Sequence, residues 1–395
     1  MANRYWVGGD GTWDGSSTSH WSASSGGSSG ASVPTSSDAV IIDFNSGSFS
    51  AGITIGAGYT AQCLSIDWST ANAAANIFLD GDSLSTISVF GNVTGAQSQG
   101  SGFNVNTNFQ IGANCIFSST DNYSSTFTFT NTLTFTLANY AQLPASSFNS
   151  VTIVFNGNTL LLYNSGGISL GSATLTMGTG TLVISTVTAT TDHFTSISAA
   201  NGIIELTNSG GLNVSSMPSA PTIGTLTLHS DAGTFTGPAT ITTLNLQGGT
   251  FNGSGSTITT LYGGSAPSQS NSGGSFTITG NNSIGTFDVE TTGLMAGIAM
   301  TMAAGQTQTI TTMSGLTLLG AVGNTLTINS TSSGSQANFS MATGTVVGTY
   351  LSLKDNNATG GATFYYDSNS IIVSDVTGWN SQGPPFANAM TMRMM

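Results

Sequence analysis

The most constraining feature of this sequence is an apolar frame that recurs down its second half. Its anchor is an isoleucine that returns after 17, 26 and 26 residues, at Ile241, Ile258, Ile284 and Ile310. A second apolar residue follows three positions after each anchor, at Leu244, Leu261, Phe287 and Met313. A third member precedes each anchor, at Phe235, Phe251, Phe276 and Met302. A fixed frame with variable inserts is typical of stacked coils, each burying its apolar face on its neighbours.

We therefore expect an all-β, single-chain parallel β-solenoid with coils of roughly 17–26 residues. Residues 126–130 and 132–137 alternate threonine with phenylalanine or leucine, which is the period of a strand with one buried face. No stretch of useful length has a helical period, so very little helix is expected. The 38% hydrophobic content, with 20 Phe, is enough to supply a core.

The composition along the chain suggests four parts. Residues 1–45 are rich in Trp, Gly and Ser and are expected to be an N-terminal cap or docking segment. Residues 46–301 form the solenoid body, and residues 302–380 form a C-terminal solenoid module and cap. Residues 381–395 leave the pattern as a short irregular, Met-rich tail.

Six side chains are candidate assembly contacts: Trp6, Trp13, Trp21, Phe386, Met390 and Met392. The tryptophans either cover the first coil or dock onto a larger assembly. The C-terminal residues are either a terminus without fixed structure or a clip into a neighbouring subunit, since methionine suits adaptable contact surfaces.

Charge excludes several partners. Only 5% of the residues are charged, the net charge is −13, and the basic residues are Arg4, Lys354 and Arg393. A phosphate-binding surface needs several lysines or arginines, so neither nucleic acid nor anionic lipid is an expected partner. No stretch approaches 18 consecutive apolar residues, so no membrane insertion is expected.

The start of the sequence lacks the basic and apolar pattern of a secretory signal. The polar skin of Ser, Thr, Gly and Asn is nevertheless typical of a surface protein. A virion surface protein made in the host cytoplasm fits both observations, and an extracellular protein exported without a signal is the alternative.

The two cysteines, Cys63 and Cys115, each lie in an apolar stretch. Buried thiols are the simpler interpretation, because free cysteine is among the most buried residue types. A bridge between two coils is the alternative.

Candidate catalytic acids are sparse. Asp80 and Asp82 are two residues apart, and so are Asp288 and Glu290, a spacing that puts two carboxylates about 6.5–7 Å apart on one strand face. Such a pair would suit a polysaccharide depolymerase. The first pair also reads as a turn, and the second as solvated side chains flanking Val289.

No cofactor or metal motif is visible. The histidines, His20, His193 and His229, lack metal-ligand spacing, and His20 beside Trp21 favours a structural role. No glycine pair precedes a helix, so phosphate-loop and dinucleotide fingerprints are absent.

Threonine runs raise the idea of an ice-binding ladder. The Ile-Thr-Thr frame puts some threonines in register, but the runs do not recur in every coil of the sequence.

Two terminal modules carry a resemblance. The first runs from Arg4-Tyr5-Trp6-Val7-Gly8-Gly9 through Trp21 to Asp43. The second begins at Ala304 and contains Ala358-Thr-Gly-Gly-Ala-Thr-Phe364 and Thr377-Gly378-Trp379. Both resemble modules of β-helical structural or tail-fibre-like proteins of tailed bacteriophages, and the middle of the chain matches only as generic coils. That family usually stops soon after the Gly-Trp, whereas this chain continues into the Met-rich tail.

The resemblance implies a virion structural role. Together with the coil frame and the uncharged skin, it predicts a non-enzymatic fibre, spike or capsid decoration that contacts other virion proteins. The chain would form a homo-oligomer, with a trimer favoured because fibres generally assemble symmetrically, and would contact host surface glycans weakly. A depolymerase tailspike and a bacterial adhesin or matrix fibre are the alternatives.

Overall fold

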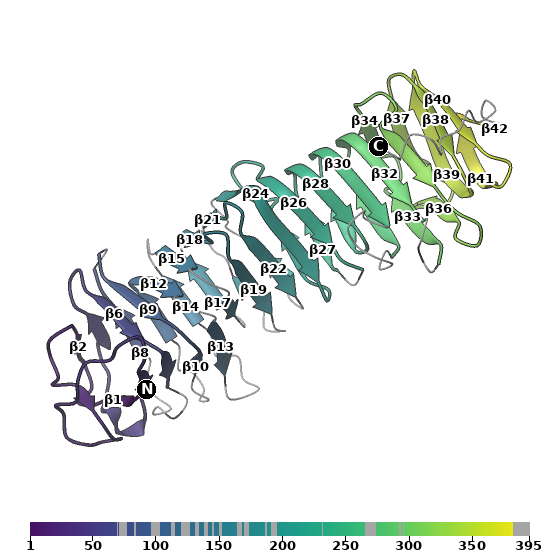
Figure 1. The fold of residues 1–395 in the computed structure, drawn as a ribbon. Coiled ribbons are helices and arrows are strands. Elements are labelled where there is room, and N and C mark those ends of the chain that lie inside the picture. The colour runs from purple at the N-terminus through teal and green to yellow at the C-terminus, as the bar shows by residue number, and fades with distance from the viewer. Residues whose placement is uncertain are drawn as a thin grey trace, which may run out of the picture. The chain divides into compact units, whose positions relative to one another are not determined.

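The fold is built from parallel strands in both parts of the chain, as Figure 1 shows for a computed structural model. The structure describes residues 1–68, 70, 77–82, 84–95, 103–111, 115–119, 127–130, 134–137, 141–143, 146–149, 152–163, 168–169, 174–185, 188–190, 196–230, 232–264, 274–291, 294 and 296–381. Within these residues the sole helical element is a 3₁₀ turn, Phe44–Ser46, which confirms the expected near-absence of helix. No helix of the described chain is long and apolar enough to cross a bilayer.

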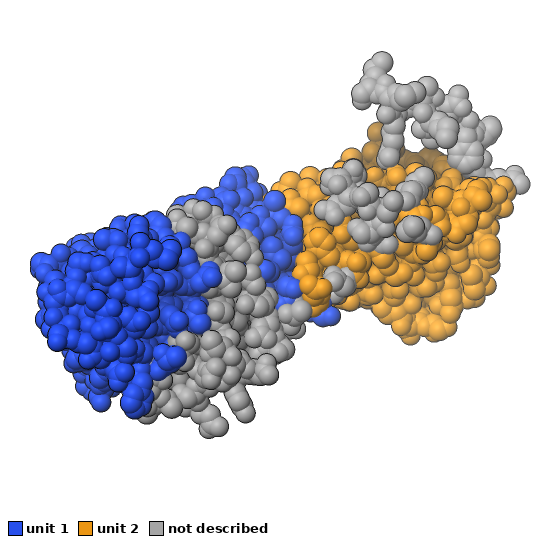
Figure 2. All heavy atoms as spheres, turned by 60° about the horizontal axis from the view of Figure 1, so that its bottom comes forward, with its two compact units in different colours: residues 1–205, 209–223 blue, residues 206–208, 224–395 orange. Residues whose placement is uncertain are grey.

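The chain divides into two compact units, coloured separately in Figure 2. Unit 1 comprises Met1–Glu205 and Ser209–Ile223, and unit 2 comprises Leu206–Asn208 and Gly224–Met395.

Unit 1 is a set of coils whose strands form three stacks. In each stack a strand pairs in parallel with the equivalent strand one coil later. The first stack contains β1 (Asn3–Trp6), β4 (Ala39–Ile41), β7 (Ser65–Asp67), β10 (Val93–Gly95), β13 (Cys115–Ser119), β16 (Ala141–Leu143), β19 (Thr159–Tyr163) and β22 (Thr181–Ser185). The second contains β6 (Thr60–Cys63), β9 (Thr86–Val89), β12 (Asn108–Ile111), β15 (Thr134–Leu137), β18 (Thr152–Val154), β21 (Thr174–Thr176) and β24 (Ser196–Thr207).

The third stack of unit 1 contains β2 (Gly11–Trp13), β5 (Ile53–Ile55), β8 (Ile77–Asp80), β11 (Phe103–Asn106), β14 (Phe127–Thr130), β17 (Ser146–Asn149), β20 (Ile168–Ser169), β23 (Thr188–Thr190) and β25 (Gly211–Asn213). β3 (Trp21–Ser22) departs from the rule, because it runs antiparallel to β1. The described parts of the alternating stretch, 127–130 and 134–137, form β14 and β15, as expected.

Unit 2 repeats this arrangement with longer strands, which Figure 1 shows side by side from β28 to β32. One set of pairings joins β26 (Thr222–Leu228), β28 (Thr240–Leu246), β30 (Thr257–Gly264), β32 (Asn282–Glu290), β34 (Thr307–Ile310), β35 (Leu316–Leu319), β37 (Ala337–Met341) and β39 (Leu351–Gly360).

Two further stacks complete unit 2. The longer one contains β27 (Thr234–Thr236), β29 (Thr250–Asn252), β31 (Phe276–Thr279), β33 (Ile298–Met302), β36 (Leu326–Ser330), the first half of β39, and β41 (Ile371–Thr377). The shorter one is a three-stranded parallel sheet of β38 (Thr345–Gly348), β40 (Thr363–Tyr366) and β42 (Trp379–Ser381). Parallel stacking of successive coils in both units is the predicted β-solenoid.

The register confirms the isoleucine frame. Ile241 pairs with Ile258, Ile258 with Ile284, and Ile284 with Ile310, so the coil lengths of 17 and 26 residues inferred above are those of the fold. All four side chains are buried. Their β-branched shape suits the pleated inner surface of a stack.

Two members of the frame were assigned wrongly. Phe287 pairs with Leu316, and Met313 is 70% exposed in the segment between β34 and β35. Phe251 pairs with Ile278, while Phe276 pairs with Met300. Insertions shifted these positions, and a one-dimensional spacing cannot show which residue returns to the register.

Phe276 instead fills space at a glycine. Gly263 occupies an inward position between Leu246 and Val289, and a Cβ added there would lie 2.6 Å from the Phe276 ring. The phenylalanine of one strand therefore packs where the glycine of another leaves room.

Candidate functional site

The most regular surface feature of unit 2 is a line of hydroxyl side chains, one from each of six successive coils. We call it the hydroxyl row: Thr240, Thr257, Ser283, Thr309, Ser340 and Thr359. Each residue pairs in register with the next, and each side chain is at least partly exposed. The row exists because the residue before a buried strand position always points outward.

A second line lies two residues earlier on the same strand faces. The amide row consists of Asn281, Thr307, Asn338, Asn357 and Thr377. Its members bond along the row: Asn357 Nδ2 donates to Asn338 Oδ1 at 2.9 Å, and Thr377 Oγ1 donates to Asn357 Oδ1 at 2.7 Å. These bonds hold the side chains in place, so the surface is ordered before any ligand arrives.

A third line of polar residues follows a different stack, through Thr234, Thr250, Thr277, Thr301 and Asn329. Neighbouring residues of a row are separated by about 4.8 Å, and residues two apart on one strand by roughly 6.5–7 Å. The Thr-x-Thr runs do not recur in every coil of the sequence, but an outward hydroxyl from threonine or serine recurs in six coils of unit 2. The recurrence is hidden in the sequence because serine and asparagine alternate with threonine and because the coil lengths differ.

The acidic pair of β32 lies outward and half-exposed. Asp288 stands between Tyr262 and Thr317 in neighbouring coils, and Glu290 stands between Gly264 and Leu319. Both carboxylates project to the same face, as the spacing predicted. Asp288 Oδ1 is buried, so the interpretation of two solvated carboxylates does not hold in full for Asp288.

The other acidic pair forms a turn. β8 ends at Asp80, so Asp82 lies beyond the strand. Its carboxylate accepts hydrogen bonds from Ser85 Oγ at 2.5 Å and from Leu84 N at 3.0 Å. The Ser85 hydroxyl is the main cause of a lowered pKa for Asp82. A carboxylate held ionised in this way is a capping acceptor and is unsuited to donate a proton near neutral pH.

The three N-terminal tryptophans are core residues. Trp6, Trp13 and Trp21 are each no more than 1% exposed. The ring of Trp21 lies edge-on to Trp6 at 4.9 Å and to Trp13 at 5.0 Å. Their indoles therefore present no surface to a partner, and assembly through residues 1–45 stays a prediction that would use other side chains. Phe386, Met390 and Met392 lie outside the described residues.

His20 belongs to the same cluster. Its ring stacks on Trp6 at 4.8 Å, and its Nδ1 lies 2.8 Å from the carbonyl oxygen of Val7. The predicted structural role is confirmed. His193 lies outside the described residues, and among the described residues no three His, Cys, Asp or Glu side chains are grouped to hold a metal.

The cysteines lie in different stacks of unit 1. Cys63 is buried at the end of β6, in keeping with the interpretation of a buried thiol. Cys115 begins β13, and its side chain lies outside the described residues.

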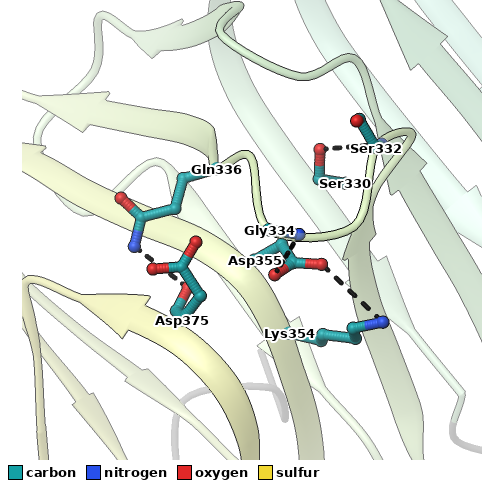
Figure 3. Close-up of polar contacts among 7 residues, drawn as sticks. All are labelled: Ser330, Ser332, Gly334, Gln336, Lys354, Asp355 and Asp375. Carbon is teal, nitrogen blue, oxygen red and sulfur yellow. Dashed lines mark hydrogen bonds and ion pairs between the residues drawn. The ribbon is translucent and has the colours of Figure 1, made fainter.

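One polar cluster was missed by sequence reasoning. Asp355 is 2% exposed, and Figure 3 shows its carboxylate accepting a hydrogen bond from Gly334 N at 3.1 Å and facing Lys354 Nζ at 3.8 Å. Nearby, Gln336 Nε2 donates to the carbonyl oxygen of Asp375 at 3.0 Å. These contacts fasten the turn before β37 to β39 and β41. Asp355 continues the inward alternation of Leu351 and Leu353 along β39. Its hydrogen bond with Gly334, in contrast, depends on how the preceding coil stacks on this one.

Comparison with known proteins adds no relative: no protein-family model, curated protein or solved structure matches this chain.

Proposed function

We propose that this chain is a non-enzymatic structural protein on the virion surface of a tailed phage. It acts as a fibre- or spike-like part or as a capsid decoration, and its hydroxyl row and amide row contact host glycans or neighbouring subunits. The observation that carries the proposal is the hydroxyl row, an uncharged, outward line in register over six coils. The resemblance of both ends to β-helical phage proteins supplies the virion assignment.

The rows suit a repeating ligand. A glycan chain offers hydroxyls at regular intervals, and each net hydrogen bond contributes about 0.5–1.5 kcal/mol. Many such contacts along a stack of coils add up by avidity while each stays weak. With a net charge of −13, the chain is better suited to neutral than to acidic polysaccharide.

Two measurements test the proposal. Immunogold microscopy of purified virions should place the chain on tail or capsid, and absence of label from every particle would remove the virion assignment in favour of a bacterial surface fibre.

Glycan binding should fall at least tenfold in the variant Thr240→Val/Thr257→Val/Thr309→Val. The matched control is Thr234→Val/Thr250→Val/Thr277→Val, which alters the third line and should bind normally.

Release of reducing ends from polysaccharide distinguishes the depolymerase alternative from the non-enzymatic proposal. Incubation with host surface polysaccharide should release no new reducing ends. Release that disappears in Asp288→Asn/Glu290→Gln would overturn the non-enzymatic assignment.

Mass photometry tests the favoured trimer, and a chain that stays monomeric at micromolar concentration would contradict it.

A second candidate function is ice binding, because the hydroxyl row and the amide row together form a regular grid with spacings of about 4.8 Å and roughly 6.5–7 Å. Thermal hysteresis in the purified chain, lost on Thr309→Lys, would establish it. No hysteresis would dismiss it and leave the glycan proposal untouched.

A further inference from the structure

One further outward line of unit 2 differs from the hydroxyl row and the amide row because it carries aromatic side chains. It follows the second halves of β30 and β32 and then β35, β38, β40 and β42. We call it the tyrosine row: Tyr262, Asp288, Thr317, Val347, Tyr365 and Asn380. Tyr262 pairs in register with Asp288, and Asp288 pairs with Thr317.

The short sheet of β38, β40 and β42 continues this line. Leu319 and Thr349 form a parallel bridge, in which the N–H group of Thr349 donates to the carbonyl oxygen of Leu318 at 3.2 Å. Two residues earlier on each strand, Thr317 therefore lies beside Val347. The register of the short sheet then extends the row through Tyr365 to its last member.

The row faces outward because its members alternate with buried residues. Tyr262 stands between Leu261 and Gly263, which are both buried, and Tyr365 follows Phe364, which is 1% exposed. Every side chain of the row is at least partly exposed. Both tyrosine rings therefore contribute to the surface of the same face of unit 2.

The spacing of the row suits an extended chain of sugars. Neighbouring members are separated by about 4.8 Å, so the two tyrosines lie four steps or about 19 Å apart. One step is close to the length that a single sugar residue adds to an extended glycan. A glycan laid along the row therefore meets about one coil per sugar.

The side chains of the row also suit sugars chemically. A pyranose ring has an apolar face of C–H groups and a rim of hydroxyls. The tyrosine rings and Val347 offer apolar contact to the face, whereas the carboxylate of Asp288, the hydroxyl of Thr317 and the amide of Asn380 are hydrogen-bonding groups for the rim. Polar members interrupt the apolar ones, so the row lacks the contiguous apolar patch that marks a protein interface.

We propose that the tyrosine row binds one neutral oligosaccharide lengthwise, with one sugar stacked on Tyr262 and another, four sugars further along, stacked on Tyr365. The polar members between them hydrogen-bond to the sugar hydroxyls. Asp288 and the net charge of −13 disfavour an acidic chain. This inference rests on the proposed contact with glycans and adds a second surface for it, one that selects for chain length.

The distance between the tyrosines predicts a length threshold. A trisaccharide spans about two steps and reaches one tyrosine, whereas a hexasaccharide spans about five steps and reaches both. Isothermal titration calorimetry of the full chain tests this with cellohexaose, laminarihexaose and chitohexaose and with the three matching trisaccharides. We expect at least one hexasaccharide to bind at least tenfold more tightly than its trisaccharide. Equal affinities, or no binding of any hexasaccharide, would overturn the proposal.

Substitution of both tyrosines separates stacking from other contacts. Tyr262→Thr/Tyr365→Thr removes the rings and keeps a residue type that suits an outward strand position. Its affinity for the hexasaccharide should fall at least tenfold, to that of the trisaccharide. Tyr262→Phe/Tyr365→Phe keeps the rings and should retain most of the affinity. Unchanged binding by the threonine variant would contradict the stacking role.

A tyrosine elsewhere provides the matched control. Tyr5 is a partly exposed strand residue of unit 1, where it pairs with Ile41. Tyr5→Thr should bind the hexasaccharide as the wild type does. An equal loss in Tyr5→Thr would show that tyrosine removal acts indirectly and would also overturn the proposal.

The hydroxyl-row variant distinguishes failure of this inference from failure of the proposed function. If Thr240→Val/Thr257→Val/Thr309→Val loses binding to host glycan while the tyrosine-to-threonine variant binds host glycan and hexasaccharide normally, the proposed function stands and this inference fails. If both variants bind host glycan normally, both fail. A tyrosine-to-threonine variant that changes oligomer mass in mass photometry and keeps its saccharide affinity would assign the row to a subunit interface and overturn the proposal.

Discussion

At the scale of single residues, burial in the N-terminal tryptophan cluster is uniform but hydrogen bonding is uneven. Trp6 Nε1 donates to the carbonyl oxygen of Gly9 at 2.6 Å. The Nε1 atoms of Trp13 and Trp21 are buried without a hydrogen-bond partner in the described structure. A buried donor without a partner costs about 1–3 kcal/mol, so the three indoles contribute differently to stability.

Replacing each tryptophan by phenylalanine should reveal the difference. Both substitutions replace the two fused rings of indole by one phenyl ring. Trp6→Phe also removes a hydrogen bond and leaves the Gly9 carbonyl oxygen without that donor, whereas Trp13→Phe removes a buried donor that has no partner. We expect Trp6→Phe to be the more destabilising by about 1–3 kcal/mol. Urea unfolding followed by tryptophan fluorescence measures both variants, and equal losses would contradict the assignment.

At the scale of elements, the strands of unit 2 are tied together by a polar ladder inside the core. Asn282 Nδ2 donates to Gln308 Oε1 at 2.9 Å, and Asn282 Oδ1 accepts from Ser256 N at 3.2 Å. All three side chains are at most 2% exposed. The ladder satisfies backbone groups at the ends of β31 and β32, where the chain turns and the strand pairing is interrupted.

Asn282→Ala should be strongly destabilising. It leaves Gln308 Oε1 and the N–H group of Ser256 without the hydrogen-bond partner that Asn282 supplies, at an expected cost of roughly 2–4 kcal/mol. The matched control is Thr277→Ala, which alters a half-exposed residue of the neighbouring strand and should change stability by under about 0.5 kcal/mol. Hydrogen exchange in β30, β32 and β34 reads out the local free energy. Unchanged protection in Asn282→Ala would dismiss the ladder as a stabilising element.

At the scale of the whole molecule, a falling pH should lower the folding stability of unit 1 first. The Ser50 hydroxyl, followed by the N–H groups of Gly52, Ala51 and Ser50, holds the pKa of Asp10 well below its usual range. The N–H groups of Ser17 and Ser16 lower the pKa of Asp14. With the folded pKa depressed, each contribution is present above the unfolded pKa of about 4 and is lost as pH falls below it.

Four of the five tryptophans lie in unit 1, namely Trp6, Trp13, Trp21 and Trp68, and the fifth, Trp379, lies in unit 2. Tryptophan fluorescence measured in a Trp379→Phe background therefore reports on unit 1. The urea midpoint that it reports should be lower at pH 3 than at pH 6. Asp10→Asn should lower the midpoint at pH 6 and shrink the difference between the two pH values. A wild-type midpoint independent of pH would contradict the role of these carboxylates.

Unit 2 shows which features of the fold the local sequence predicts. Alternation along a strand fixes which side chains face inward, because successive side chains point to opposite faces. The sequence alone therefore determined the all-β class, the coil lengths of 17 and 26 residues and the buried isoleucine line, which are confirmed in the register. It also determined the turn at Asp82 and the structural role of His20.

Only the tertiary structure decided which residues contact one another between neighbouring coils. How the inserts return the chain to register decides four features: Leu316 in place of Met313, Phe276 over Gly263, the hydrogen bond from Gly334 to Asp355, and the hydroxyl row. A coil of any length can close as long as its ends meet, and the entropy cost of a longer loop grows only slowly. Spacing along the chain therefore predicts that coils stack, whereas contacts between coils are set by pairing, which selects one register among several that sequence periodicity allows.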